Sequence, residues 1–386
     1  MKADRQLGRA SSFILAGAMV VLFIVVGLAS MTMHDAAGLS EPSLRARTAP
    51  PSGMPAPTED PTQNSTADAA SMSEAALNAR PGQGPVPAAA AIDCPGPTVR
   101  VRNKEELYSA LGRANPGDVI SLSDGVYSGN FTANRAGTPE RRIYLCGGAG
   151  AVLDGGGTDT GYVLHLDHAD YWVISGLTVR NGQKGIVADT VKGAILQKVT
   201  VTGLGQEGIH LRRNSTSNLV VENTVRDTGK VTPEYGEGIY VGTAVSNWCS
   251  VTACRPDESN FNVLARNTIS NTTAENIDIK EGTIQGVISG NSFSGNGMTS
   301  SDAWVNVKGN AWTIENNTGT DSPRDGFQTH NILLGWGDHN LFRSNIATIG
   351  GRGTAVASTP PMNNTVACSN QVIGNGRLSN IKCTHL

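Results

Sequence analysis

Five short segments of this sequence place lysine, arginine, histidine, tyrosine and acidic residues at matching positions. In each segment the third and fifth residues are mainly apolar, while the fourth and sixth are mainly polar. This alternation is typical of a half-buried β-strand, whose successive side chains point to opposite faces. The segments are EGIHLR, EGIYVG, ENIDIK, AWVNVK and DGFQTH, beginning at residues 207, 237, 275, 303 and 325.

If the segments lie side by side, their polar positions form columns on one face. Such a concentration of charge over five segments favours a binding or catalytic groove over a solvated face with cross-strand ion pairs. The first column is His210, Tyr240, Asp278, Asn306 and Gln328. The second is Arg212, Gly242, Lys280, Lys308 and His330.

These residue types can perform β-elimination on a uronic acid. That reaction needs a group that neutralises the sugar carboxylate, a base that removes the adjacent proton, and a proton donor for the leaving oxygen. Lys280 is the candidate base, because Lys308 and Arg212 would disfavour its charged form and lower its pKa. The same cations could hold the carboxylate and stabilise the developing negative charge. Tyr240 or His210 could supply the proton to the leaving group.

An acidic row stands at the first position of the segments, interrupted once by Ala303. Its carboxylates suggest an alternative way to neutralise the substrate, since Ca²⁺ prefers oxygen ligands. The candidate ligands are Glu237, Glu275 and Asp278. The second position holds mostly glycine, which would leave room for a ligand, and Trp304 could stack on a sugar ring there. The candidate substrate-binding residues are Asn276, Trp304, Asn306, Gln328 and His330.

The segments belong to a longer repeat that is marked by asparagine. The repeated asparagines are separated by 44, 24, 26, 28 and 25 residues, and Cys249 and Cys254 fall in the longest interval, where they could close a small loop. A helix-free repeat of about 25 residues is typical of a parallel β-helix, whose coils stack about 4.8 Å apart. A propeller blade would need about 40 residues, and a leucine-rich repeat needs a leucine signature. The asparagines, expected to hydrogen-bond along one column, are Asn223, Asn267, Asn291, Asn317, Asn345 and Asn370.

The predicted fold class is all-β, a single-stranded right-handed parallel β-helix with an N-terminal capping helix. That helix is expected over about residues 104–114, with Asn103 as its N-cap and Glu106 completing a capping box. Pro116 and Gly117 end it, and it could cover the open end of the strand stack. A plain β-sandwich with asparagine-rich turns is the alternative.

The chain divides into three parts. In residues 1–34, three basic residues precede an apolar run at about residues 13–28, which indicates a signal peptide or a retained signal anchor. Residues 35–92 are rich in Pro, Ala, Ser and Thr and read as a flexible linker. Residues 93–386 form the β-helix domain. The predicted location is therefore secreted or on the extracellular face of the membrane, with membrane anchoring if the apolar segment is retained.

The composition limits the classes of molecule that the protein is expected to bind. The net charge is −3 and charged residues make up 16%, so a nucleic-acid-binding face is not expected. The six cysteines form no C-x-x-C pair, and in an exported chain they indicate disulfides rather than a zinc site. We expect Cys94–Cys146 to tie the cap to the first coils and Cys368–Cys383 to close the other end. A monomer that binds an acidic polysaccharide is the expected state.

Residues 94–386 resemble the pectate-lyase-like right-handed β-helix superfamily. Within it, the five-residue spacing of Glu275 and Lys280 is similar to the alginate lyase and chondroitinase B family. In that family the catalytic lysine follows a Ca²⁺-ligating glutamate by five residues, and an arginine lies one coil later. Here Thr273 stands where that family has a further acidic ligand, and Lys308 stands where it has the arginine.

The sequence therefore predicts a polysaccharide lyase that cleaves a uronic-acid-containing polymer, with Ca²⁺ as the candidate cofactor. Three alternatives remain at this stage. A glycoside hydrolase could use two carboxylates among Glu237, Glu275, Asp278 and Asp325. A C5-epimerase would share the proton abstraction of a lyase. A non-catalytic carbohydrate-binding or adhesion protein would use the groove for binding alone.

Overall fold

The computed structural model describes residues 78–84, 87–359 and 362–386. The expected signal segment lies outside these residues, as does most of the expected linker. The described end of the linker range lies against the β-helix, because Ile92 N donates to Gln197 Oε1 at 2.8 Å and Gln285 Nε2 donates to the Arg80 carbonyl at 3.0 Å. Among the described residues, none of the helices has the length and apolar character needed to span a membrane.

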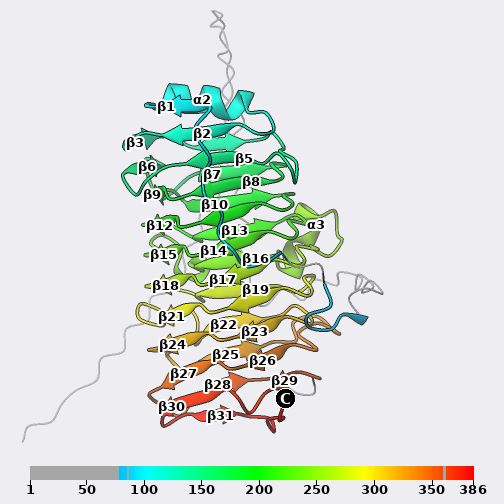
Figure 1. The fold of residues 1–386 in the computed structure, drawn as a ribbon. Helices are drawn as coiled ribbons and strands as arrows, with labels where there is room; N and C mark the ends of the chain where they lie inside the picture. Colours follow the sequence, from blue (N-terminus) through cyan, green and yellow to red (C-terminus); the bar gives the residue numbers. More distant parts are fainter. Residues whose placement is uncertain (1–77, 85–86, 360–361) are drawn as a thin grey trace, which may run out of the picture. The chain divides into compact units, whose positions relative to one another are not determined.

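Three parallel sheets wind into a stack of coils (Figure 1), which confirms the predicted β-helix. Sheet A contains β1 (Val99–Val101), β2 (Val119–Leu122), β5 (Ile143–Cys146), β8 (Trp172–Ser175), β11 (Ile195–Gln197), β14 (Leu219–Val221), β17 (Val263–Ala265), β20 (Val287–Ser289), β23 (Thr313–Glu315), β26 (Leu341–Arg343) and β29 (Thr365–Val366). Sheet B contains β3 (Gly125–Ser128), β6 (Ala151–Asp154), β9 (Thr178–Arg180), β12 (Thr200–Thr202), β15 (Thr224–Arg226), β18 (Thr268–Ser270), β21 (Ser292–Ser294), β24 (Thr318–Thr320), β27 (Ile346–Ile349) and β30 (Gln371–Gly374). Sheet C contains β4 (Phe131–Ala133), β7 (Tyr162–Asp167), β10 (Lys184–Asp189), β13 (Ile209–Arg212), β16 (Ile239–Val241), β19 (Ile277–Ile279), β22 (Ala303–Val307), β25 (Asp325–Thr329), β28 (Thr354–Ala357) and β31 (Arg377–Ser379).

Each coil takes one strand from sheet A, one from sheet B and one from sheet C. Strands of successive coils pair in parallel, and the pairing on sheet C has the register that the five segments predict. Ile239 pairs with Ile277, which pairs with Val305, which pairs with Phe327. Apolar residues at these positions are buried and form one continuous core inside the coils.

The asparagine ladder forms as predicted, at the corner between sheets A and B. Each side-chain Nδ2 donates to the Oδ1 of the next asparagine at 2.9–3.0 Å, from Asn223 to Asn370. The same Nδ2 also donates to a backbone carbonyl, as Asn291 does to Leu264. Buried amides without such partners would destabilise the fold, so the repeated asparagine is a folding requirement.

The predicted helix near the start of the domain is present as α2 (Lys104–Arg113). Asn103 Oδ1 accepts from the Glu106 backbone N–H at 2.9 Å, while the Glu106 carboxylate reaches back to the backbone N–H of Arg102. Leu107 and Leu111 are buried and belong to the main core. Short helical segments in the described part of the chain include η1 (Pro233–Tyr235), η2 (Val245–Asn247) and α3 (Trp248–Val251).

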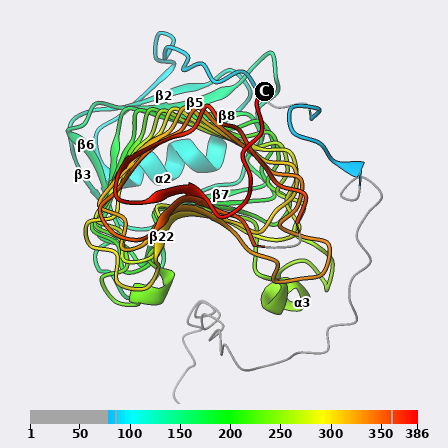
Figure 2. The same cartoon turned by 90° about the horizontal axis from the view of Figure 1, so that it is seen from below.

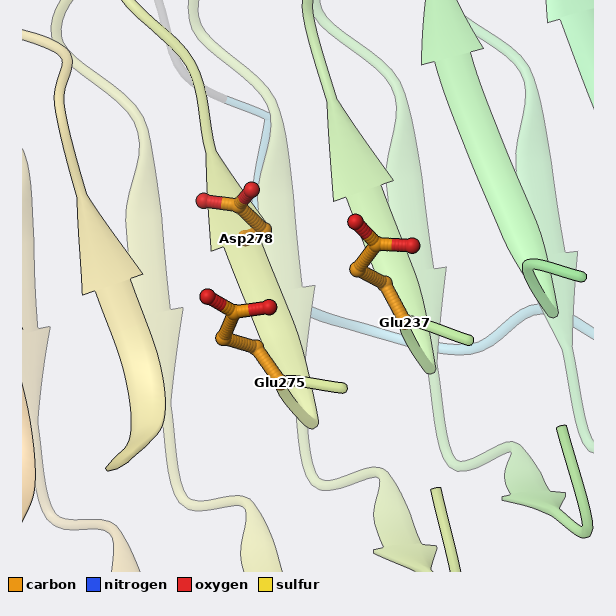
Figure 3. A group of neighbouring side chains, drawn as sticks. All are labelled: Glu237, Glu275 and Asp278. Carbon is orange, nitrogen blue, oxygen red and sulfur yellow. The ribbon is translucent and has the colours of Figure 1, made fainter. Parts of the chain in front are cut away.

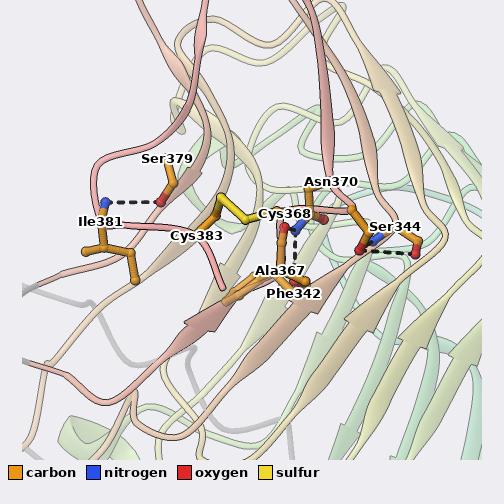
Figure 4. Close-up of a disulfide and its surroundings, with 9 residues drawn as sticks. Phe342, Ser344, Ala367, Cys368, Asn370, Ser379, Ile381 and Cys383 are labelled. Atoms are coloured by element: carbon orange, nitrogen blue, oxygen red, sulfur yellow. Dashed lines mark hydrogen bonds between the residues drawn. A yellow bond between two sulfur atoms is a disulfide. The ribbon is translucent and has the colours of Figure 1, made fainter. Parts of the chain in front are cut away.

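All six cysteines are paired, as the sequence predicts. The bonds are Cys94–Cys146, Cys249–Cys254 and Cys368–Cys383. Figure 4 shows the last of these beside Asn370, where the asparagine ladder ends. This bond therefore joins the final residues of the chain to the last coils.

Candidate functional site

The outward face of sheet C brings most of the predicted site residues together. The fourth-position column runs from His210 through Tyr240 and Asp278 to Asn306 and Gln328, in paired strands. These side chains are nonetheless well buried. The face is a groove with few exposed atoms, which strengthens the electrostatic interactions inside it.

Two predicted substrate-binding residues do not face this groove. Asn276 and Trp304 are both fully buried. Asn276 Nδ2 donates to Thr272 Oγ1 at 2.9 Å, and the Trp304 indole packs edge-on against Phe327 and donates to the Thr320 carbonyl. The chain bends inward at the start of these strands, so alternation fails there. The prediction that Trp304 stacks on a sugar is wrong.

The glycines at the same position also have a packing role. A Cβ at Gly208 would lie 2.5 Å from Val225, and one at Gly238 would lie 2.5 Å from Ile269. These glycines let the chain turn tightly against the core, and they do not leave room for a ligand in the groove.

Two lysines from adjacent coils share one buried carboxylate at the centre of the groove. Lys308 Nζ donates to Asp278 Oδ1 at 2.6 Å, and Lys280 Nζ lies 3.0 Å from Asp278 Oδ2. Burial opposes ionisation of Asp278, but the two ammonium groups outweigh this effect and lower its pKa to about 2. Asp278 is therefore held as a carboxylate between the two ammonium groups at the centre of the groove.

Tyr240 lies between residues of its two neighbouring coils. The His210 ring stacks on it with centroids 4.1 Å apart, and Lys280 Nζ lies 5.0 Å from the centre of the phenol ring. His210 Nε2 is 2.9 Å from the Gly242 carbonyl, so this nitrogen carries the proton and donates it. Burial lowers the pKa of His210, and the neutral ring orients Tyr240 beside Lys280.

The three predicted metal ligands lie together (Figure 3). Oxygens of Glu237, Glu275 and Asp278 are all within 4.8 Å of one another. Burial and then repulsion from Glu207 raise the pKa of Glu237 well above its ordinary value, and burial followed by Asp278 raises that of Glu275. Glu237 Oε2 has no hydrogen-bond partner among the described residues.

The donor set fits Ca²⁺ poorly. This ion takes about six to eight oxygen ligands, yet both oxygens of Asp278 already face ammonium groups, and Glu275 accepts from the Asn306 amide. A divalent cation here would have to displace or repel Lys280 and Lys308.

Arg212 lies in a network that the sequence analysis did not find. Its guanidinium donates to both oxygens of Asp189, at 2.6 and 3.1 Å, and to Tyr162 Oη at 3.1 Å. On the same side, Lys184 Nζ donates to Glu207 Oε1 at 2.6 Å. The segment that contains Lys184 and Asp189, KGIVAD, has the same glycine and isoleucine positions as EGIHLR, so the alignment could have been extended by one coil.

Asn306, Gln328 and His330 meet at the other end of the groove. His330 Nε2 lies 2.9 Å from Gln328 Oε1 and 3.2 Å from Asn306 Oδ1. Gln328 Nε2 donates to Asp325 Oδ2 at 2.9 Å. Burial, then the charge of Lys308, lowers the pKa of His330, so this end offers neutral hydrogen-bonding groups.

Two long loops of a single coil flank the groove. Residues 227–238 join β15 to β16 and include η1, and residues 242–262 join β16 to β17 and include η2 and α3. Figure 2 shows α3 beyond one edge of the concave sheet that carries β7 and β22, with the other short green helix beyond the opposite edge. These loops account for the one long interval in the asparagine repeat.

Comparison with known proteins shows which solved structures this fold is similar to. No protein-family model and no curated protein matches the sequence. The crystal structure of an alginate lyase from Paenibacillus sp. str. FPU-7 is 31% identical, with a TM-score of 0.69 over 73% of this chain and 99% of that chain. The crystal structure of pectate lyase Pel9A has a TM-score of 0.56 at 14% identity, over 71% of this chain and 72% of that chain, and supports the fold alone.

Proposed function

Because this chain belongs to the pectate-lyase-like family of right-handed parallel β-helix proteins, we propose that it is a polysaccharide lyase that cleaves a uronic-acid-containing polymer by β-elimination. The 31% identity to an alginate lyase over nearly that whole chain supports a lyase kind of function. Three disulfides agree with an extracellular location, and we propose that the protein is secreted or surface-anchored through residues 1–34.

The observation that carries the proposal is the position of Tyr240, Lys280 and Lys308 on three successive coils. Lys308 holds the substrate carboxylate, which makes the proton on the adjacent carbon more acidic. Lys280 acts as the base in its neutral amine form. Asp278 contacts both lysines, so Lys308 keeps this carboxylate paired while Lys280 is in its neutral form.

The elimination then proceeds with the electrons balanced. Lys280 takes the proton from the carbon next to the carboxylate, and that electron pair forms a carbon–carbon double bond. The bond to the bridging oxygen breaks, and the oxygen leaves with its electron pair. Tyr240 donates its phenolic proton to this oxygen, and His210 keeps the phenol in position by stacking. The products are a new chain end and an unsaturated sugar.

Arg212 contributes to the groove differently from the central lysines. Its pairing with Asp189 and Tyr162 fixes the guanidinium at one side of Tyr240. We propose that it orients the polymer there, while Lys280 and Lys308 act on the reacting sugar. Asn306, Gln328 and His330 would bind the polymer on the opposite side of the reacting sugar.

Ca²⁺ remains the alternative group for neutralising the carboxylate, with Glu237, Glu275 and Asp278 as ligands. We favour the lysines, because Asp278 is already bound to both of them. On this basis, activity should persist after chelation. A loss of activity in chelator that added Ca²⁺ restores would overturn the lysine assignment.

The test is turnover of uronic-acid polymers by the full chain. Alginate, pectate, glucuronan and glycosaminoglycans are incubated with the protein, with and without Ca²⁺, and formation of the unsaturated sugar is followed by its ultraviolet absorbance. New reducing ends without this absorbance would indicate a hydrolase, and binding without either product would indicate a non-catalytic protein.

The Lys280→Ala variant tests the base on whichever polymer is cleaved. Its kcat/KM should fall by about 10²–10⁴-fold, the range that general-base catalysis supplies. Lys198→Ala is the matched control, because Lys198 is exposed in a turn between sheets A and B. Full activity of Lys280→Ala would show that another residue removes the proton.

A further inference from the structure

A pocket of about 100 Å³ lies beside Tyr240, on the side of the groove toward β10. Its floor includes Lys184, Arg212 and Tyr240 from sheet C. Tyr235 from one flanking loop and Asn247 from the other complete it, so the pocket spans both long loops of the same coil. It has room for one edge of a sugar ring next to the reacting sugar.

The loop that carries Asn247 is held firmly in place. The Asp257 carboxylate is fully buried and accepts from the backbone N–H groups of Arg213 and Asn214 at 2.9 and 2.8 Å. Glu281 Oε1 accepts from the backbone N–H of Val245 at 2.6 Å, and the Cys249–Cys254 bond closes the far part of the loop. This side of the pocket is therefore preorganised before a ligand binds.

The opposite loop is anchored by a residue of the next coil. Thr273 Oγ1 donates to the carbonyl of Pro233 at 2.8 Å, two residues before Tyr235 in η1. Thr228 Oγ1 donates to the Gly236 carbonyl at 2.6 Å, which fixes the end of the same turn. Thr273 stands where the resemblance would place an acidic metal ligand, and here it supports the loop of the pocket.

The two cations that line the pocket are each paired with a carboxylate of the protein. Lys184 is paired with Glu207, and Arg212 is paired with Asp189. At the centre of the groove, Lys280 and Lys308 both contact Asp278. The proposed function assigns the substrate carboxylate to Lys308 at the centre, while the pocket offers paired charges and the Asn247 amide, which suit hydroxyl groups.

We propose that this pocket is the subsite for the sugar adjacent to the reacting uronate, and that it binds the hydroxyl edge of that sugar instead of a carboxylate. The inference rests on the proposed lyase function for the identity of the ligand. Asn247 donates to and accepts from the hydroxyl groups, Tyr235 packs against the ring, and the two loops set which sugar fits.

The experiment measures binding separately from turnover. Tetrasaccharides of mannuronate and of galacturonate are titrated calorimetrically into full-length Lys280→Ala protein, which holds them uncleaved. Adding Asn247→Ala should raise the Kd of the tetrasaccharide that binds better by about tenfold, as expected for loss of a hydrogen-bonding group in a preorganised site. Ser246→Ala is the matched control, since Ser246 is exposed on the same loop. An unchanged Kd for Asn247→Ala would overturn the subsite.

Asn247→Asp separates hydroxyl binding from carboxylate binding. An aspartate still accepts from hydroxyl groups, so the proposal expects a Kd within about threefold of the parent. A carboxylate in the pocket would be repelled, and a loss of tenfold or more that lessens at high salt would overturn the proposal. If no uronic-acid polymer is cleaved but these binding effects appear, the subsite stands and the lyase function fails. If cleavage occurs but Asn247→Ala binds normally, the opposite holds.

Discussion

The asparagine corner and the groove on sheet C follow opposite rules. At the corner, the same residue recurs in coil after coil, and each buried amide is paired with its neighbours. In the groove, residue type changes from one coil to the next. Here the buried atoms Glu207 Oε2, His210 Nδ1 and Glu237 Oε2 have no hydrogen-bond partner among the described residues.

The difference teaches which parts of a repeat carry function. Polar groups that are buried without partners reduce stability, so a stack of coils selects residues that satisfy one another. Where the repeat is broken and polar groups remain unsatisfied, a substrate can supply the missing partners. Departure from the repeat therefore marks the site, and adherence to it marks the scaffold.

The largest expected effect on activity comes from Tyr240→Phe, which removes a reactive group from the groove and leaves the scaffold intact. The variant keeps the ring that stacks on His210 but removes the hydroxyl that protonates the leaving oxygen. We expect kcat/KM to fall by about 10²–10⁴-fold, the usual contribution of a general acid. Steady-state kinetics on the cleaved polymer, together with a thermal melt, measure both sides of the comparison.

Tyr144→Phe is the matched control, because Tyr144 lies in β5 of sheet A and outside the groove. Its activity and melting temperature should equal those of the parent. If Tyr240→Phe kept full activity, the proton donor would be another group. If it melted far below the parent, the phenol hydroxyl would belong to the scaffold.

Asn291→Ala tests the asparagine corner, where a substitution should reduce stability and leave activity unchanged. Asn291 accepts from Asn267 and donates to Asn317 at 3.0 Å in each case, so its removal leaves buried partners unpaired. The free energy of unfolding should fall by about 1–3 kcal/mol, while kcat/KM of the folded protein stays unchanged. Denaturant unfolding measures the loss, and Asn296→Ala, at an exposed position, is the control. A stable variant would mean that the ladder contributes little.

The sequence predicted the scaffold better than the site, for a physical reason. The repeated asparagines and the alternation of Ile277, Asp278 and Ile279 follow from periodic structure, and they are found in the expected register. Alternation holds only along a straight strand, however. At the bend before β19 and within β22, Asn276 and Trp304 turn inward, and no local pattern distinguishes that bend from a strand.

The pairing of charges also could not be predicted from the sequence. The columns gave Arg212 and Lys308 the same roles beside Lys280, which were to lower its pKa and to hold the substrate carboxylate. Their roles differ because Asp189, one coil earlier, neutralises Arg212, whereas the two lysines share Asp278. Which carboxylate faces which cation depends on side-chain direction within each coil, and this information is absent from the alignment of segments.

The smallest expected effect concerns the folding stability that is lost because the Glu237 carboxyl group is buried in the groove. Burial and neighbouring carboxylates raise the pKa of Glu237, so the folded protein holds this proton at a pH where the unfolded chain has released it. Stability therefore falls as pH rises from the ordinary pKa of Glu towards the raised value. Each unit of that difference costs about 1.4 kcal/mol. Glu237→Gln should remove this cost and be more stable than the parent at neutral pH.

The measurement is the difference in unfolding free energy between parent and Glu237→Gln at pH 4, 5, 6 and 7. Asp278 and Glu207 have lowered pKa values and lose their contribution as pH falls, but they are present in both proteins and cancel in the difference. Glu258→Gln, at an exposed position, should show no such trend. A difference that does not grow with pH would mean that Glu237 is ionised and paired in the folded state. The groove would then have no unsatisfied carboxylate at that position, and its contrast with the asparagine corner would be weaker.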